Sequence, residues 1–173
     1  ERSVLIFVDE PVMAAYGSSA YAGVREDDVH EMMQPIFEAV RDAGGVPGMH
    51  VCGNSDWGVV LRSGVQVVNF EAYEHGDTLA LSPDEVRELL DRDGYIAWGI
   101  VPTSAQVRDE TAESLVERLQ SCIDTMADKG FSRDELVERS ILTPSCGTGS
   151  MDIDDTKTVF RLLRETRELL QGQ

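Results

Sequence analysis

"YIAWGIV" (residues 95–101) is an apolar run without the polar alternation that marks a strand with one face in water. Such a run is typical of a strand buried on both faces of a parallel sheet. Four more short runs rich in β-branched residues recur along the chain, namely "VLIFV" (4–8), "VPGMHV" (46–51), "VQVVNF" (65–70) and "SILTP" (140–144). Segments with helical spacing or helix-start signals lie between them, so the chain predicts a parallel α/β sheet covered by helices.

The segments between the strands carry apolar residues three and four positions apart. Residues 31–45, "EMMQPIFEAVRDAGG", have such a stripe, whose members are Met33, Ile36, Phe37 and Val40. Pro35 inside this segment predicts either a kink or the start of a second helical half. A last amphipathic helix is predicted over residues 156–170.

Two more helices are predicted from a start signal and from apolar spacing. Ser82, Pro83 and Glu85 form a capping-box pattern with proline at the first helical position. Within residues 109–130 the apolar stripe consists of Leu115, Leu119, Cys122 and Met126. This stripe predicts core packing, and it assigns Cys122 to the core rather than to a functional site.

Two parallel architectures fit this order of elements: an open doubly wound sheet, and an arc of a (β/α)-barrel of TIM type. Five strand–helix units in 173 residues give about 35 residues per unit. This is the usual length of one unit in a barrel whose complete form has eight strands. No GxGxxG pattern or P-loop follows a predicted strand, which disfavours a nucleotide-binding open sheet. We therefore expect residues 1–173 to form a single domain, an arc of about five units, with three units preceding Glu1.

Composition excludes several classes of function. The formal net charge of −17 disfavours nucleic-acid binding, which requires clustered lysines and arginines. No run approaches the ~18 apolar residues of a membrane span, so we expect no membrane partner. Three cysteines are too few and odd in number for a disulfide framework, which indicates a reducing, cytoplasmic setting. The chain begins with Glu1 rather than Met, as a processed or excised piece of a longer protein would.

Residues with metal-ligand chemistry fall at the ends of three predicted strands. His50 and Cys52 are two positions apart, so both project from the same face at the end of one strand. Glu71 ends the next strand, and Cys146 follows the last strand in "TPSCGTG". The carboxyl ends of parallel strands lie on one rim, where chemistry is done in such folds. Glu74 or His75 could take the place of Glu71.

The donor set then selects the metal. Two thiolates, an imidazole and a carboxylate suit tetrahedral Zn²⁺ better than Mg²⁺ or Ca²⁺, which prefer oxygen ligands. Three strong ligands and a displaceable carboxylate are typical of a catalytic site. Gly147 and Gly149 are expected to let the backbone bend tightly beside Cys146. The alternative is that the cysteines are core thiols without a ligand and Glu71 is an ordinary rim carboxylate.

The strand ending in "DEP", the H-x-C pair, the strand-end Glu and the final "P-x-C-G" together resemble one superfamily. It contains cobalamin-independent methionine synthase and uroporphyrinogen decarboxylase, and the resemblance is to its zinc-dependent methyltransferases in particular. It implies that the chain is the C-terminal part of a (β/α)8 barrel, strands four to eight. It also implies zinc bound by His50, Cys52, Glu71 and Cys146, with Glu71 as the displaceable ligand.

The resemblance further implies what the site acts on. Asp9 falls on the family's aspartate that contacts the amino group of homocysteine, and Glu10 lies beside it; the alternative for both is a helix-cap or loop carboxylate. The implied partners are a small thiol substrate and a methyl donor, either a corrinoid protein or a folate. "HVCGN" looks closer to the corrinoid- and thiol-linked branch, and residues 99–105 lack the histidine that the folate-using synthases carry there.

Alternatives remain open for what covers the edges of the predicted arc and for what the chain does. An incomplete barrel has open edges, so we expect the N-terminal half of the barrel, or self-association, to cover them. The chain could instead be a non-catalytic zinc-binding fragment. A third possibility is a metal-free enzyme like uroporphyrinogen decarboxylase, although the ligand set argues against that activity.

Overall fold

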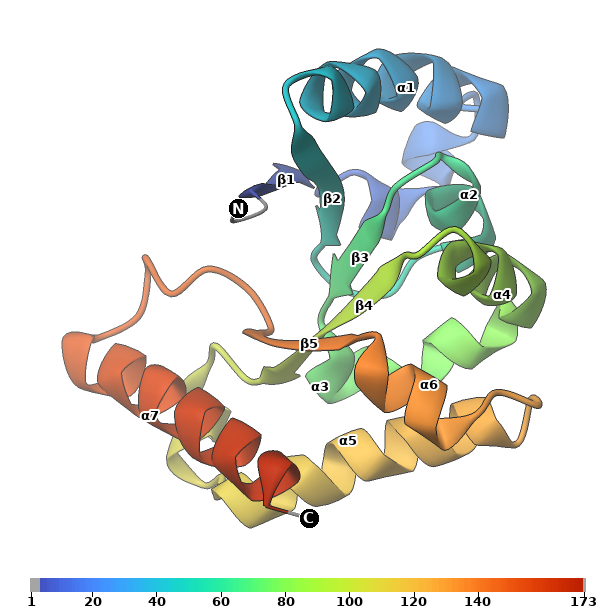
Figure 1. Cartoon of the computed structure of the whole chain (residues 1–173). Coiled ribbons are helices and arrows are strands. Elements are labelled where there is room, and N and C mark those ends of the chain that lie inside the picture. Colours follow the sequence, from blue (N-terminus) through green and yellow to red (C-terminus); the bar gives the residue numbers. More distant parts are fainter. Residues whose placement is uncertain (1–3, 173) are drawn as a thin grey trace.

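Five strands form one parallel sheet in a computed structural model that describes residues 4–172 (Figure 1). Each strand coincides, within two residues, with one of the five apolar runs that predicted it. The strands are β1 (Val4–Asp9), β2 (Gly45–Val51), β3 (Val67–Phe70), β4 (Tyr95–Val101) and β5 (Ser140–Pro144). The prediction of a parallel α/β sheet is therefore confirmed.

The spatial order of the strands is their order in the sequence, β1-β2-β3-β4-β5, and all four pairs are parallel. The order does not reverse between β1 and β5, so this sheet lacks the switch point of a doubly wound fold. Sequential order is compatible with an arc of an α/β barrel. Within residues 4–172, β1 and β5 each have a neighbour on one side only.

Helices alternate with the strands, and α1, α2 and α4 lie along the same side of the sheet (Figure 1). The helices are α1 (Glu26–Asp42), α2 (Trp57–Arg62), α3 (Ala72–His75), α4 (Pro83–Asp91), α5 (Ala112–Ala127), α6 (Arg133–Glu138) and α7 (Ile153–Gln171). Short 3-10 turns are η1 (Met13–Ala15), η2 (Ser19–Tyr21), η3 (Gly76–Leu81) and η4 (Ala105–Arg108). All four predicted helices are present.

Helix α1 differs in two details from what its sequence predicts. Pro35 lies inside one continuous helix, α1, and does not divide it. Ile36 is exposed, whereas Met33 and Phe37 of the same predicted stripe are buried. The buried residues of this helix are Val29, Met33, Phe37 and Val40, at spacings of four, four and three, and Ile36 falls outside that stripe.

The predicted capping box of α4 does not form. Ser82 occupies the N-cap position and Pro83 begins the helix, but the Ser82 side chain makes no capping hydrogen bond. Glu85 instead forms an ion pair with Arg62 of α2, so tertiary pairing replaces the local interaction. A capping box does form at another helix, α5. There the side chains of Thr111 and Ser114 each accept a hydrogen bond from the backbone N–H of the other residue.

The hydrophobic core lies between the sheet and the helices. Trp57, Phe70 and Trp98 are fully buried there, with ring centroids 4.8 Å apart for Trp57–Phe70 and 5.7 Å for Phe70–Trp98. Each such side chain contributes roughly 1.5–3 kcal/mol by leaving water. Cys122 is buried on the inner stripe of α5, as predicted.

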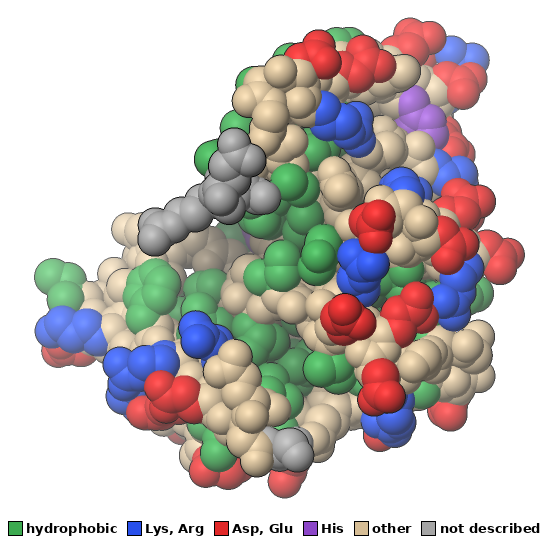
Figure 2. Space-filling model, in the orientation of Figure 1, with side chains coloured by type: hydrophobic (Ala, Val, Ile, Leu, Met, Phe, Trp, Pro, Cys, Tyr) green, Lys and Arg blue, Asp and Glu red, His purple; other side chains and the backbone are tan. Residues whose placement is uncertain are grey.

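The surface has charged areas and an apolar area. Figure 2 shows acidic and basic side chains gathered over the helices, and hydrophobic side chains in a band across the middle of the visible face. Exposed apolar residues of β1 include Val4, Leu5 and Ile6. None of the helices in residues 4–172 is long and apolar enough to cross a bilayer.

Candidate metal centre

Three of the four predicted ligands meet at the carboxyl ends of the strands. His50 is the sixth residue of β2, Cys52 follows that strand directly, and Cys146 lies two residues after β5. One ligand atom from each lies within 4.8 Å of the other two. The Nε2 atom of His50 is 3.1 Å from Cys52 Sγ, which is 3.4 Å from Cys146 Sγ. Residues 94 positions apart in the chain are thus brought into contact.

The imidazole of His50 is held in place by the neighbouring strand. His50 is only 7% exposed, and its Nδ1 atom lies 2.6 Å from Oδ1 of Asn69 on β3. The Asn69 amide nitrogen donates to the carbonyl of Ala97 on β4 and to the hydroxyl of Thr143 on β5, both at 2.8 Å. Three strands therefore anchor the side chain that orients His50.

Negative groups surround the thiol of Cys52. The pKa of Cys52 rises to about 11, first because the thiol is partly withdrawn from water and next because it is hydrogen-bonded to Cys146. The charges of Cys146, Asp9 and Glu71 raise the same pKa further. A thiolate at Cys52 is therefore unfavourable unless a nearby cation compensates its charge, and a bound metal ion would supply such a charge.

A cavity of about 500 Å³ opens beside His50, Cys52 and Cys146. Its walls are mainly apolar and include Phe7, Pro11 and Pro144. The Phe7 ring packs against Gly48, where a Cβ would lie 2.5 Å from the nearest ring atom. Asp9 is the charged residue among the described lining residues. The ligand side chains thus face a space large enough for a small molecule.

Glu71 lies near this group but not in it. It is the N-cap residue of α3, directly after β3, and its charge reaches Cys52. Its carboxylate is outside the set of atoms that lie within 4.8 Å of one another, so its role as fourth ligand stays a prediction. The two alternatives lie outside the set as well: the Glu74 carboxylate accepts a hydrogen bond from Gln106, and His75 ends α3.

The two candidate substrate carboxylates differ in their surroundings. Asp9 is exposed, ends β1 and is paired in register with His50. Glu10 accepts a hydrogen bond from the backbone N–H of Val12 at 3.0 Å, as a loop carboxylate does. Asp9 faces the cavity beside the ligands, whereas Glu10 lines a different, apolar pocket with Met13 of η1.

The glycines after Cys146 are not required by the backbone. Neither Gly147 nor Gly149 has a positive φ, and a Cβ on either would meet nothing within 4 Å. The bend within the protein itself therefore needs no glycine at either position, and their role beside a bound ligand stays a prediction. Cys146 is placed instead by Ser145, whose backbone N–H donates to Val101 at 2.8 Å and whose hydroxyl accepts from the backbone N–H of Thr103 at 3.1 Å.

Sequence reasoning missed Asn69 as part of the site. Its signal was a polar residue within the buried run "VQVVNF", two positions before Glu71 and so on the same face of the strand. A buried amide needs partners for its oxygen and its nitrogen, which is a reason to look for a polar neighbour on adjacent strands.

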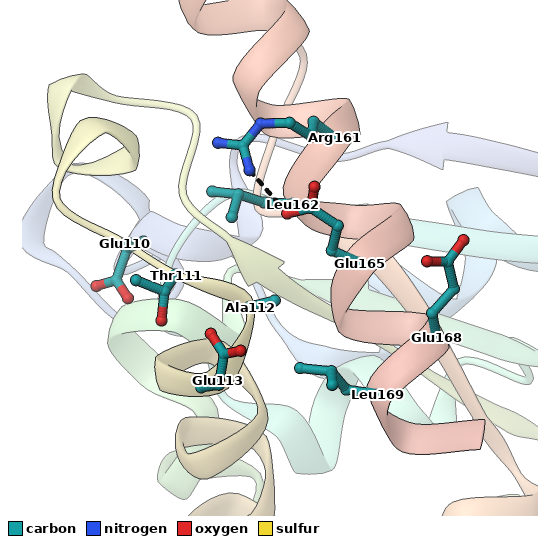
Figure 3. Close-up of a pocket in the computed structure, with 9 residues that line it drawn as sticks. All are labelled: Glu110, Thr111, Ala112, Glu113, Arg161, Leu162, Glu165, Glu168 and Leu169. Atoms are coloured by element: carbon teal, nitrogen blue, oxygen red, sulfur yellow. Dashed lines mark hydrogen bonds and ion pairs between the residues drawn. The ribbon is translucent and has the colours of Figure 1, made fainter. Parts of the chain in front are cut away.

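A second hollow, of about 540 Å³, lies between the start of α5 and α7 (Figure 3). Its lining is rich in carboxylates, and Arg161 pairs with Glu165 across one helical turn at 2.7 Å. No His or Cys lines it, and its carboxylates form no metal-binding group with the other described residues. We assign it no function.

Comparison with known proteins adds nothing to this geometry. No protein-family model matches the chain, and no curated protein sequence matches it.

Proposed function

We propose that the chain is the metal-bearing part of a zinc-dependent methyltransferase that activates a small thiol. The observation that carries the proposal is the convergence of His50, Cys52 and Cys146 beside an open cavity at the carboxyl ends of parallel strands. The sheet would then be an arc of an eight-stranded barrel, whose active site occupies this rim.

The donor set supports zinc. One imidazole and two thiolates are soft ligands that suit Zn²⁺, and they leave one tetrahedral position for a water, a weak ligand or a substrate. Structural zinc sites have four protein ligands, whereas here three converge and an open cavity adjoins them. A bound Zn²⁺ would keep a substrate thiol as its thiolate, which is the nucleophilic form.

The chain's own residues would bind and orient the thiol. Phe7 and Pro144 give the cavity an apolar wall, and Asp9 offers a negative charge there. Because no Lys or Arg is among the described residues that line it, the cavity favours a thiol with an amino group over a thiol with only a negative charge. Homocysteine or a similar small aminothiol fits this description.

Methyl transfer would make a carbon–sulfur bond as the bond between the methyl carbon and its donor breaks, leaving the electron pair on the donor. The donor proposed is a methyl-corrinoid or a methyl-folate. Glu71 is proposed as the fourth ligand that the thiol displaces. With two thiolates, Glu71 and a neutral His50, a bound Zn²⁺ would give the centre a charge of −1, and a thiolate in place of Glu71 would leave that charge unchanged.

X-ray absorption at the zinc edge tests the proposal in the longest natural form of the chain. Saturating homocysteine should change the zinc shell from two sulfur ligands to three, with one proton released per thiol near neutral pH. Homoserine, which has oxygen in place of the sulfur, is the control and should change neither. A two-sulfur shell that homocysteine leaves unchanged would favour a structural metal instead.

A further inference from the structure

The position of Asn69 determines more than the location of His50. His50, Asn69 and Ala97 lie side by side on β2, β3 and β4, because each is the register partner of the next. His50 and Asn69 are both 7% exposed, so each polar atom that they bury needs a hydrogen-bond partner within the protein.

The hydrogen bonds decide how the Asn69 amide is turned. The carbonyl oxygen of Ala97 can only accept, so the Asn69 atom that lies 2.8 Å from it must be the amide nitrogen. The second hydrogen of that nitrogen is directed to the Thr143 hydroxyl, also at 2.8 Å. The amide oxygen is thereby left facing His50.

That orientation in turn decides which nitrogen of His50 carries the proton. The Asn69 oxygen only accepts, so the Nδ1 atom, 2.6 Å away, must be the donor. A neutral imidazole has one ring proton, which leaves a lone pair on Nε2. This is the nitrogen that faces Cys52 Sγ at 3.1 Å, and the Cys52 thiol can donate to it.

We propose that Asn69 is a positioning residue that holds neutral His50 in its Nδ1–H tautomer and so presents the Nε2 lone pair to the metal position between Cys52 and Cys146. The functional meaning of this tautomer rests on the metal site proposed above. A histidine side chain free in water favours the opposite tautomer, in which Nε2 carries the proton and therefore has no lone pair for a metal. The amide therefore works against the ring's own preference.

The anchoring also has a mechanical consequence. The Asn69 amide is fixed by the Ala97 backbone on β4 and by the Thr143 side chain on β5, so it has no freedom to flip. Flipping it would place an amide N–H against Nδ1 and an oxygen against the Ala97 oxygen. The two N–H bonds of the Asn69 amide are thus both used to hold its oxygen facing Nδ1 of His50.

Long-range ¹H–¹⁵N NMR spectra of the labelled, reduced, metal-free chain test the assignment directly. The ring signals of His50 are identified by their loss in His50→Gln, since the chain has only three histidines. Wild type should show a protonated Nδ1 and an unprotonated Nε2. A proton found on Nε2 in the wild-type protein would overturn the inference.

Variants separate positioning from general packing. Asn69→Leu removes the acceptor at similar volume, and it should shift the ring toward the Nε2–H form and weaken Zn²⁺ binding by about 10–100-fold. Asn69→Asp keeps an oxygen that accepts from Nδ1, so the tautomer should be retained and the affinity should exceed that of Asn69→Leu, although its second oxygen replaces the N–H that donates to Ala97. Thr143→Val is the matched control, since it removes a partner of the same amide without touching the ring. Affinity is measured by competition with a chromophoric chelator.

Equal losses of affinity in Asn69→Leu and Thr143→Val, with the tautomer unchanged in both, would reduce Asn69 to a packing role and overturn the proposal. If Asn69→Leu does not fold, the wild-type spectrum and Asn69→Asp decide the question. A wild-type chain that binds no zinc would defeat the proposed function, whereas the metal-free spectra would still report the tautomer. Zinc binding with Nε2–H in the metal-free wild type would defeat this inference alone.

Discussion

Cys52, Cys122 and Cys146 have the same side chain in two different environments. Cys52 and Cys146 are exposed at the rim of the sheet, with their sulfurs 3.4 Å apart and His50 beside them. Cys122 is buried in the apolar stripe of α5, with its Sγ close against Gly76 of η3. Environment rather than residue type therefore decides which thiols can bind a metal.

Removing either rim thiol should abolish tight zinc binding. Cys52→Ser and Cys146→Ser each leave two of the three converging ligands, and a hydroxyl is a poor substitute for a thiolate. Cys122→Ser is the control and should leave the metal content unchanged. Metal per chain is measured after exhaustive dialysis. If Cys122 is required and Cys146 is not, the site has been assigned to the wrong residues.

Cys122 should make the protein less stable in alkali. Burial, and secondarily the charge of Asp77, raises the pKa of Cys122 from 9.0 to about 11. Between these values the unfolded chain has lost the proton that the folded chain retains, so the free energy of unfolding falls as pH rises, by up to about 1.4 kcal/mol per pH unit. The fall begins near pH 9 and ends near pH 11.

Urea unfolding of wild type and Cys122→Ala at several pH values measures this effect. The variant loses packing energy by an amount that does not depend on pH, so the stability difference between the two proteins should shrink only above pH 9. A difference that stays constant to pH 11 would show that Cys122 does not titrate in this range.

Among the elements, the junction of β4 and β5 determines where Cys146 lies. The ladder between these strands is irregular at Gly99 and Val101. A Cβ on Gly99 would lie 2.3 Å from the Phe70 carbonyl oxygen and 2.8 Å from the Ser145 Cα. The absence of a side chain at Gly99 therefore lets β3, β4 and the segment after β5 approach closely.

Gly99→Ala should disrupt both the fold and the metal site. The methyl group meets backbone atoms of Phe70 and Ser145, which cannot yield as a side chain can, so we expect a loss of about 1–3 kcal/mol or more. Zinc affinity should fall as well, because Ser145 precedes Cys146. Gly147→Ala is the control, as its methyl group would meet nothing within 4 Å. Urea denaturation measures the stability, and chelator competition measures the zinc affinity. Equal stability and equal affinity of the two variants would contradict the role of Gly99 in this close approach.

At the scale of the whole molecule, the edge strand β1 is the most exposed part of the sheet. Val4 and Ile6 are 60% and 42% exposed, and β1 has a described neighbour only on the β2 side. An apolar edge strand is a template for pairing with another chain. The negative charge opposes association, but it is carried mainly by acidic side chains over the helices (Figure 2).

The chain should therefore self-associate through this edge when nothing else covers it. Ile6→Lys places a charge on β1 and should shift the protein toward monomer in sedimentation velocity runs over a wide concentration range. Ile153→Lys is the control, since Ile153 is 74% exposed on α7, away from the edge. Monomeric wild type at every concentration, or equal association of the two variants, would argue against pairing at β1.

The sequence alone determined the elements and part of the site. Apolar runs rich in β-branched residues located the five strands within residues 4–172, and in the central strands β2, β3 and β4 burial on both faces leaves no polar alternation. Spacing of three and four residues assigned Cys122 to the core. The separation of two positions placed His50 and Cys52 on one face of β2, since side-chain direction in a strand depends only on the local backbone.

Only the tertiary structure decided how distant residues meet. The contact of Cys52 with Cys146 depends on the order and register of five strands and on the close approach at Gly99. The orientation of the Asn69 amide depends on acceptors supplied by β4 and β5. Ser82 and Glu85 match a local capping pattern, yet Glu85 forms an ion pair with Arg62 of α2 instead. Local patterns predict backbone state, but long-range packing chooses the partner of each polar group.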